Sequence, residues 1–261
     1  ETTSMVGVLL ASIAVSVLLE LTINEHLWWR LLYAFGALSA VFGWQLQKQL
    51  KIKTMNSVEY SNLPTVKILR QYAGVIAINT IQSGATMLTY IVPFVLLNIL
   101  VPQVNQVQYD TMLQFNNGII LADIGLILLF KQWWSYQQKV ASSIKWLWLI
   151  MAVIVVPLMH YLPVLNATAI NIVKLLMVAI GVAALVPCYD LQQQYRHLLP
   201  PGQEYLVLGL AYKLGGSLIA STMPAISLII WRYSGSMALI GAYIAFWWLL
   251  AAYYARPQLN P

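Results

Sequence analysis

Long apolar runs separated by short polar segments dominate this chain. A membrane-spanning helix needs about 20 mainly apolar residues, and eight runs approach that length. The eight runs cover residues 5–21, 28–46, 72–100, 115–130, 146–165, 169–189, 206–230 and 237–254. The run 72–100 is longer than one crossing requires and has Pro93 late in it, which predicts a tilted or bent helix. The pattern as a whole predicts an all-α polytopic membrane protein with eight crossings.

Composition excludes a water-soluble domain. Hydrophobic residues make up 60% of the 261 residues and charged residues 8%, whereas soluble domains carry about 25% charged residues. A chain with this few charged residues cannot cover a water-exposed surface. Most of its outer face must therefore meet the lipid bilayer. The one cysteine, Cys188, lies in an apolar run and permits neither an internal disulfide nor a thiolate metal cluster.

Positive charge alternates along the connections between the runs. Lys and Arg occur in segments 47–70, 131–145 and 190–205 and in the C-terminal tail, and they are absent from 22–27, 101–114 and 166–168. The exceptions on the opposite side are Arg30 and Arg232. Basic residues near helix ends mark the cytoplasmic side, so eight crossings place both ends of the chain in the cytoplasm. We expect the membrane to be an inner or plasma membrane. The net charge of +6 therefore reflects membrane orientation, and we expect no nucleic-acid partner.

Aromatic residues agree with these helix ends. Trp146 and Trp148 lie at the start of the run 146–165, and tryptophan rings favour the headgroup region of a bilayer. Trp247 and Trp248 lie deeper in their run, where we expect them to pack against other helices.

Four ionisable residues fall within the apolar runs: Glu20, Asp123, Lys174 and Lys213. Such groups are costly in hydrocarbon and usually face a bundle interior or a water-filled path. Glu20 lies at the end of its run, and Lys174 is close enough to a helix end to reach the headgroups by snorkelling. Asp123 and Lys213 lie roughly 10 Å or more below the surface at 1.5 Å rise per residue. One interpretation makes them a structural ion pair or charges in a solvated cavity. The other makes Lys213 a binding group for an anion and Asp123 a proton-coupling group, with Glu20 as a second proton-coupling candidate.

Two of the predicted helices carry polar side chains along one face. In the run 72–100 these are Asn79, Ser83, Thr86 and Tyr90, with Gln82 beside them. In the run 206–230 they are Lys213, Ser217 and Ser221. Polar stripes on apolar helices often make interhelical hydrogen bonds, but two stripes, one of them with a lysine, favour a shared aqueous cavity.

Motifs for catalysis and metal binding are missing from the sequence. We find no phosphate-binding Gly-Lys-Ser/Thr loop, no Gly-x-Ser-x-Gly elbow and no paired-carboxylate motif. His160 and His197 have no neighbouring ligand at metal-binding spacing. We therefore expect no enzyme activity, no cofactor and no metal site.

Two segments carry a resemblance to a known family. The segment 198–224, Leu-Leu-Pro-Pro-Gly-Gln-Glu-Tyr-Leu-Val-Leu-Gly-Leu-Ala-Tyr-Lys-Leu-Gly-Gly-Ser-Leu-Ile-Ala-Ser-Thr-Met-Pro, resembles the entry into the eleventh helix of the major facilitator superfamily. It is most similar to the metabolite:proton symporter branch that includes proline/betaine transporters. The segment 29–36, Trp-Arg-Leu-Leu-Tyr-Ala-Phe-Gly, resembles the opening of the family's sixth helix.

The resemblance implies a fold and a domain organisation. The eight predicted helices correspond to helices five to twelve of a twelve-helix transporter. Residues 1–46 would be the last two helices of the N-terminal bundle, 47–70 the central cytoplasmic loop, and 71–261 the C-terminal six-helix bundle. The first four helices would belong to the same protein or to a second chain. The family binds its substrate between the two bundles, and its seventh and eleventh helices correspond to the two helices with polar stripes.

Departures from the family pattern bear on the substrate. Lys213 replaces the Asn of the branch's Tyr-Asn pair, which points to an anionic substrate, and the loop 131–139 keeps only scattered positive charge in place of the family's gate motif. The leading hypothesis is a proton-coupled secondary transporter of a small polar or anionic metabolite, working by alternating access. The substrate-binding candidates are Asn79, Gln82, Ser83, Tyr90, Lys213 and Ser217. The alternatives are a drug or metabolite exporter of the same fold, or a non-transporting membrane receptor or scaffold subunit.

Overall fold

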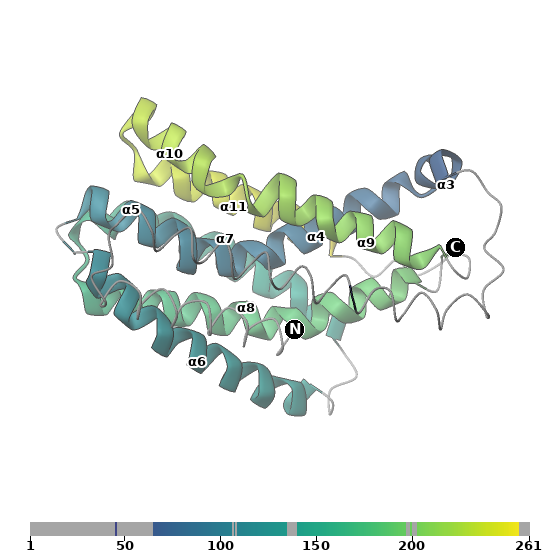
Figure 1. Cartoon of the computed structure of the whole chain (residues 1–261), viewed down its shortest axis with the longest axis horizontal. Helices are drawn as coiled ribbons and strands as arrows, with labels where there is room; N and C mark the ends of the chain where they lie inside the picture. Colours follow the sequence, from purple (N-terminus) through teal and green to yellow (C-terminus); the bar gives the residue numbers. More distant parts are fainter. Residues whose placement is uncertain are drawn as a thin grey trace. The chain divides into compact units, whose positions relative to one another are not determined.

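The computed structural model describes residues 65–105, 107, 109–134, 140–196, 199 and 203–255, together with Gln45 (Figure 1). The chain divides into two compact units, Glu1–Leu63 and Pro64–Pro261. The helices described below all belong to the second unit. Apart from Gln45, which is helical, the predicted runs 5–21 and 28–46 lie outside the described residues, and Glu20 lies outside them too.

The described part of the second unit is helical and contains no strand. In chain order its α-helices are α3 (Thr65–Gln71), α4 (Ala73–Ile91), α5 (Leu97–Val104), α6 (Tyr109–Trp134), α7 (Val140–Tyr161), α8 (Ala167–Arg196), α9 (Glu204–Leu214), α10 (Met223–Ser234) and α11 (Met237–Tyr254). Two π-helices, η1 (Val92–Leu96) and η3 (Gly215–Ala220), and one 3-10 helix, η2 (Leu162–Val164), connect some of them.

Five stretches of these helices are long and apolar enough to cross a membrane: Ala73–Val104, Ile144–Val164, Ala167–Arg196, Leu206–Ser234 and Met237–Tyr254. A sixth, Phe115–Phe130 within α6, is apolar but shorter. The six runs predicted from residue 72 onward are therefore helices in the structure. The chain has the helices of a membrane-spanning protein.

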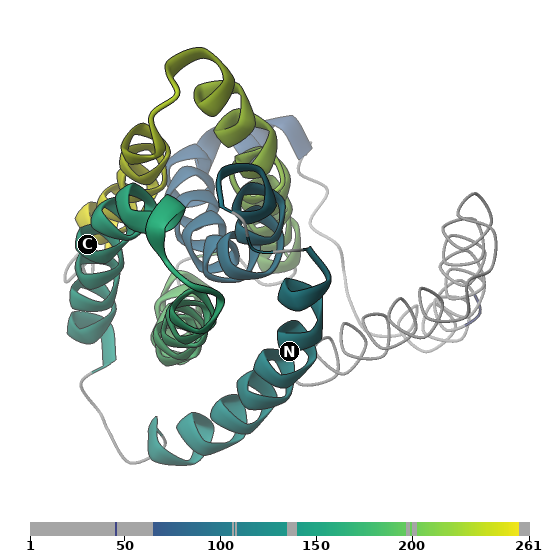
Figure 2. The same cartoon turned by 90° about the vertical axis from the view of Figure 1, so that its left-hand side faces the viewer.

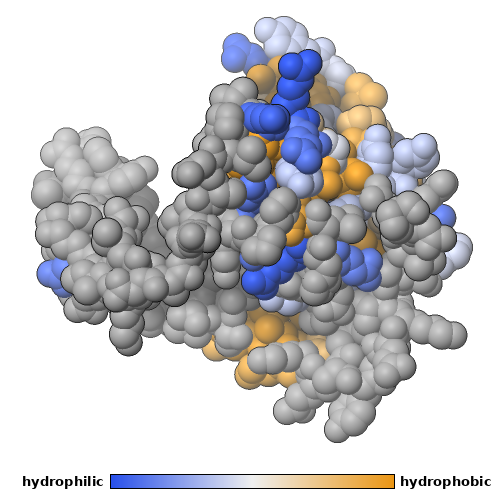
Figure 3. Space-filling model, turned by 90° about the vertical axis from the view of Figure 1, so that its right-hand side faces the viewer, coloured by the Kyte–Doolittle hydropathy of each residue, from blue (hydrophilic) through white to orange (hydrophobic). Residues whose placement is uncertain are grey.

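The outside of the helices is apolar along their length. Large hydrophobic side chains such as Val153 (70% exposed), Leu129 (65%) and Leu218 (60%) lie on the surface of different helices. Exposed apolar surface on this scale marks contact with lipid or protein rather than water. Figure 3 shows that hydrophilic residues gather at the end of the unit where α3 lies and α9 begins. This distribution matches an apolar bundle with a polar end at a membrane surface.

Helix α4 has the central place in the unit. It packs against α8, α9, η3 and α11, while α11 lies along α7 and α6 lies along α8. Helices α6 and α10 lie on opposite sides of this arrangement (Figures 1 and 2). Polar residues of α4 therefore meet several neighbouring helices at once.

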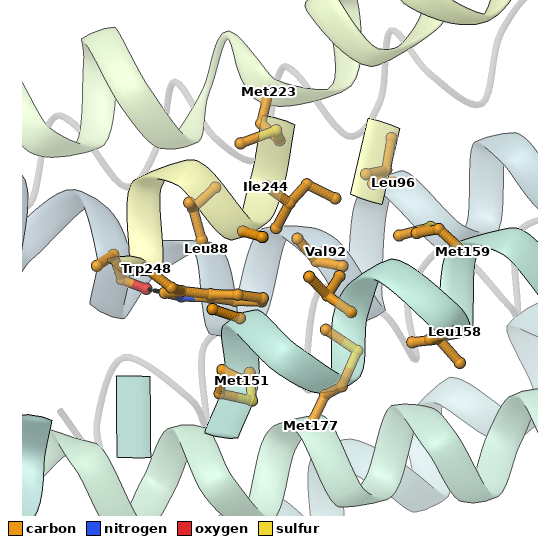
Figure 4. Packing of buried hydrophobic residues seen from close by; sticks show 14 of the residues in the cluster. Leu88, Val92, Leu96, Met151, Leu158, Met159, Met177, Met223, Ile244 and Trp248 are labelled. Atoms are coloured by element: carbon orange, nitrogen blue, oxygen red, sulfur yellow. Dashed lines mark hydrogen bonds between the residues drawn. The ribbon is translucent and has the colours of Figure 1, made fainter. Parts of the chain in front are cut away.

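Apolar side chains from these helices interlock in one large cluster. Figure 4 shows Leu88 and Val92 from α4 and η1 beside Met151 of α7 and Ile244 of α11. Trp248 is fully buried among them, and its ring N–H donates a hydrogen bond to the Ala85 carbonyl at 3.0 Å. Trp248 therefore packs against other helices, as predicted.

Trp148, in contrast, does not lie in a headgroup region. It is fully buried in α7, whereas its neighbour Trp146 is 63% exposed. The expected headgroup position of Trp148 is therefore wrong. Its face of α7 turns toward α4 and α11, where its N–H finds an acceptor in the protein interior.

The two π-helices lie where the sequence disturbs regular helix geometry. Pro93 lies at the start of η1, and a proline inside a helix removes one backbone hydrogen bond and crowds the carbonyl four residues before it. The wider turn of a π-helix, common as a single-turn insertion in α-helices, relieves that crowding. In η3 the pair Gly215-Gly216 permits a similar turn, and the Ser221 N–H donates to the Gly216 carbonyl at 2.8 Å.

Glycines bring α4 and η3 into backbone contact. A Cβ atom on Gly215 would lie 2.6 Å from the Thr80 carbonyl oxygen and 2.7 Å from the Gly84 nitrogen. A Cβ atom on Gly84 would meet the Ile219 side chain at 2.6 Å. Small residues at such crossings let membrane helices approach closely. The crossing fixes which face of η3 is buried and which is turned away from α4.

Candidate functional site

The polar residues of α4 are mostly buried, and several of them are hydrogen-bonded, although the Asn79 side-chain oxygen has no partner among the described residues. Asn79 is 2% exposed, and its side-chain N–H donates to the Val75 carbonyl of its own helix at 2.9 Å. Ser83 is 2% exposed, and its hydroxyl accepts a hydrogen bond from the Gln192 amide of α8 at 3.1 Å. Both predicted site residues therefore lie in the interior of the unit.

Gln82 joins three helices. Its amide N–H donates to the Ala251 carbonyl of α11 at 2.6 Å, and its oxygen accepts the ring N–H of Trp148 of α7 at 3.0 Å. The side chain is fully buried. A satisfied buried amide stabilises a unique arrangement of helices. In this structure Gln82 thus cross-links the core.

Tyr90 lies at the far end of the same stripe. It is half-buried, and its ring stacks on Phe94 with centroids 6.5 Å apart. Thr86, between Gln82 and Tyr90, donates to the Gln82 carbonyl at 2.9 Å and lies 3.2 Å from the Cys188 sulfur of α8. The stripe on α4 therefore points into helix–helix contacts along much of its length.

The stripe on α9 and η3 has the opposite environment. Lys213, Ser217 and Ser221 are all exposed, because the other face of η3 packs on α4 through Gly215. Lys213 forms no ion pair with the carboxylates that the structure describes. The structure thus places Lys213 and Ser217 on one surface, and it keeps them apart from the buried polar residues of α4.

Asp123 is fully buried in α6. It lies one turn from Ile119 and one turn from Ile127, on the α6 face that packs against Val178 and Val182 of α8. Neither carboxylate oxygen has a hydrogen-bond partner among the described residues. A carboxyl group without described partners in an apolar interface is costly when ionised.

Lys174 lies in the same α6–α8 interface, one turn before Val178. It is fully buried, and its ammonium group donates to the side-chain oxygens of Asn98 of α5 and Asn116 of α6, the second at 3.0 Å. Asn116 is two helical turns before Asp123 on α6. A lysine of α8 thus connects the helix that follows η1 to α6, close to the end of the bundle where α8 begins (Figure 1).

The expectation that Lys174 snorkels to the headgroups is wrong, since none of its surface is exposed. Its position near a helix end suggested that reading. A better signal was present in the sequence: Asn171 and Lys174 share one face of an apolar helix at three-residue spacing. Two further asparagines, Asn98 and Asn116, interrupt apolar runs elsewhere, and amides at such positions need buried partners.

Metal chemistry has no anchor in the described part of the chain. No group of three or more His, Cys, Asp or Glu side chains there is placed to hold a metal ion. The polar groups described in and beside the α6–α8 interface are the Lys174 ammonium, the Asp123 carboxyl group and asparagine amides.

No protein-family model, curated protein or solved structure matches the chain.

Proposed function

We propose that this protein is a secondary active transporter that moves a small polar or anionic metabolite across an inner or plasma membrane. The observation that carries the proposal is a pair of fully buried ionisable groups, Lys174 and Asp123, in one interface between apolar helices. Ionisable residues at such depth are expensive to keep and mark ion and substrate pathways in membrane proteins.

Asp123 is the proposed proton-coupling group. Its carboxylate has no described partner, so its protonation changes the charge of the α6–α8 interface without breaking an ion pair. Such a group can link proton uptake to a rearrangement of the two helices. Glu20, the second proton-coupling candidate, lies outside the described residues.

The exposed stripe is the proposed wall of the substrate path. Lys213 supplies a positive charge and Ser217 a hydroxyl on a face that α4 leaves open. Alternating access places substrate between two helix bundles, and the resemblance to the major facilitator superfamily makes the Pro64–Pro261 unit the C-terminal one. We propose that Asn79, Gln82 and Ser83 stabilise the helix packing behind this wall, and that Tyr90 lies at the end of the α4 stripe. The C-terminus lies in the cytoplasm in this proposal.

Uptake into liposomes tests the proposal. The full-length protein is reconstituted, and accumulation of labelled lactate, succinate and proline is measured with and without an inward proton gradient. We expect the gradient to drive accumulation of at least one of these solutes. We expect Asp123→Asn to abolish gradient-driven accumulation and to spare exchange of labelled for unlabelled solute, because an amide cannot carry the proton but leaves the path intact.

Glu204→Gln is the matched control for this carboxylate. Glu204 lies in the first turn of α9 and pairs with Arg196 at 3.6 Å, outside the α6–α8 interface, so its variant should keep the response to the gradient. A response in Asp123→Asn equal to that of the unaltered protein would exclude Asp123 as the coupling group. Absence of uptake, combined with export of lipophilic cations such as tetraphenylphosphonium, would favour an exporter.

A further inference from the structure

The buried lysine carries a positive charge that no described group neutralises. Both hydrogen bonds of the Lys174 ammonium end on neutral amide oxygens, those of Asn98 and Asn116. No described carboxylate lies within ion-pair distance of it. Removing an ammonium from water is expensive even when amides solvate it. A bound anion would supply the missing charge.

The amides of Asn98 and Asn116 are turned with their oxygens toward the Lys174 ammonium. An ammonium group has donors and no acceptor, so each amide that contacts it must present its oxygen. The oxygens of Asn98 and Asn116 are thereby occupied, and the Asn98 N–H is held by the Phe94 carbonyl at 2.7 Å. Further hydrogen-bonding capacity beside Lys174 therefore comes from its own third N–H and from other residues.

Two groups of the cluster have unused hydrogen-bonding capacity. An ammonium group has three N–H donors, and Lys174 makes two hydrogen bonds to described residues. Asn171, one turn before Lys174 on the same face of α8, is 8% exposed, and neither atom of its amide group has a partner in the described part of the chain. Unpaired amides in an apolar interior are rare because they are costly.

We propose that Lys174 and Asn171 bind the carboxylate of a small organic anion at the interface of α5, α6 and α8, with Asn98 and Asn116 holding the lysine in place. A carboxylate offers two oxygens to two adjacent donors. The site has one positive charge and no arginine, which suits a single carboxylate better than a phosphate dianion. The inference rests on the proposed function and names its substrate class.

The site also explains why hydrogen bonds of Lys174 connect α5 to α6 and α8. Asn98 and Asn116 belong to different helices, and Lys174 is the one described side chain that bonds both. An anion that draws the ammonium toward Asn171 weakens its hold on these two amides. Binding is thereby linked to the packing of α5, the helix that follows the π-helix η1.

Thermal unfolding of the purified full-length protein tests the site. The melting temperature Tm is measured during titration with sodium lactate and sodium succinate. Two controls lack a carboxylate: sodium chloride at equal ionic strength, and lactamide, the neutral amide analogue of lactate. We expect the carboxylates to raise Tm in a saturable manner and lactamide and chloride to leave it unchanged. Lys174→Met should remove the rise, Lys174→Arg should keep part of it, and the exposed Lys145→Met should keep all of it.

Asn171→Leu separates a binding role from a structural one. Replacing an unpaired buried amide by an apolar side chain should raise the Tm of the ligand-free protein. The same change should weaken carboxylate binding about tenfold or more, because it removes a hydrogen bond to a charged group. A purely structural residue would not shift these two quantities in opposite directions, and this variant keeps the test sound if Lys174→Met does not fold.

Several results would overturn the inference. These are no Tm rise with either carboxylate, an equal rise with chloride, an undiminished rise in a folded Lys174→Met protein, or a rise that depends on Lys213 and not on Lys174. The transport assay separates this outcome from failure of the proposed function. Solute uptake without a carboxylate-dependent Tm rise sinks the site alone, whereas a Lys174-dependent rise without uptake of any solute sinks the transporter and leaves the site standing.

Discussion

Lys174 and Lys213 both lie within described apolar spans, and the structure gives them opposite surroundings. Lys174 in α8 is fully buried and hydrogen-bonded to two asparagines of other helices. Lys213 in α9 is exposed, and the residues one and two turns after it, Ser217 and Ser221, are exposed as well. One lysine is part of the interior, and the other is part of a surface.

The difference shows that the face of the helix decides the environment, rather than depth along it. Lys213 lies farther from the ends of its predicted run than Lys174 does, yet it is the more accessible of the two. The α9–η3 helix turns Gly215 toward α4 and Lys213 away from it. The α8 helix turns Lys174 toward α6, together with Val178 and Val182.

The largest expected effect concerns Gln82, which tests whether the α4 stripe belongs with the interior or with the Lys213 surface. Gln82→Leu leaves the Trp148 N–H and the Ala251 carbonyl without their partner. Each of the two buried groups left unpaired costs about 1–3 kcal/mol, so we expect the free energy of unfolding to fall by about 2–6 kcal/mol. Denaturant unfolding in detergent micelles measures the change.

Gln194→Leu, at an exposed position of α8, is the control for Gln82 and should change stability little. If Gln82→Leu instead kept full stability and only weakened solute binding, Gln82 would belong to the substrate path beside Lys213.

Asn116 tests the interior side of the comparison. Asn116→Leu deprives the buried Lys174 ammonium of one of its two acceptors. Losing a hydrogen bond to a charged group costs about 1.5–3 kcal/mol, so thermal unfolding should begin at a clearly lower temperature. Ser217→Ala, in the exposed stripe, removes a polar group of similar chemistry without a buried partner and should leave unfolding unchanged. Equal effects of the two changes would erase the distinction between the two regions.

The glycine crossing tests why Lys213 faces outward. A Cβ atom at Gly215 would clash with the Thr80 carbonyl, and overpacking of this kind costs about 1–3 kcal/mol. At Gly209, on the same helix, a Cβ atom would meet nothing within 4 Å, so Gly209→Ala should stabilise the helix by about 0.5–1 kcal/mol. Unfolding measurements should therefore give opposite signs for Gly215→Ala and Gly209→Ala, and matching signs would mean that α4 and η3 are not in backbone contact.

The sequence predicts the helices of this region well because their length and apolarity are set by the bilayer. It predicts the polar face of α4 equally well, since the spacing of Asn79 and Ser83 follows the helix period. It cannot predict which helix lies opposite that face. The partners of Gln82 come from positions 66 and 169 residues away, and only tertiary packing brings them together.

The same limit explains the candidates that changed character. Trp148 and Lys174 both lie near the starts of their predicted runs, 146–165 and 169–189, where a single helix in a bilayer would place them at the headgroups. Neighbouring helices offer them buried acceptors instead, in Gln82 for Trp148 and in two asparagines for Lys174. Lys213 has no such neighbour among the described helices, so its polar stripe stays on the surface.

The smallest expected effect completes the comparison. Lys213→Met should change the free energy of unfolding by less than about 0.5 kcal/mol, because an exposed side chain without a buried partner contributes little to stability. Its effect should appear in transport alone, as a higher KM for an anionic solute with a smaller change for a neutral one such as proline. Thermal unfolding and liposome uptake of the same preparation give both numbers. A stability loss above about 1 kcal/mol would mean that Lys213 is buried and hydrogen-bonded as Lys174 is. The two lysines would then not differ in their surroundings.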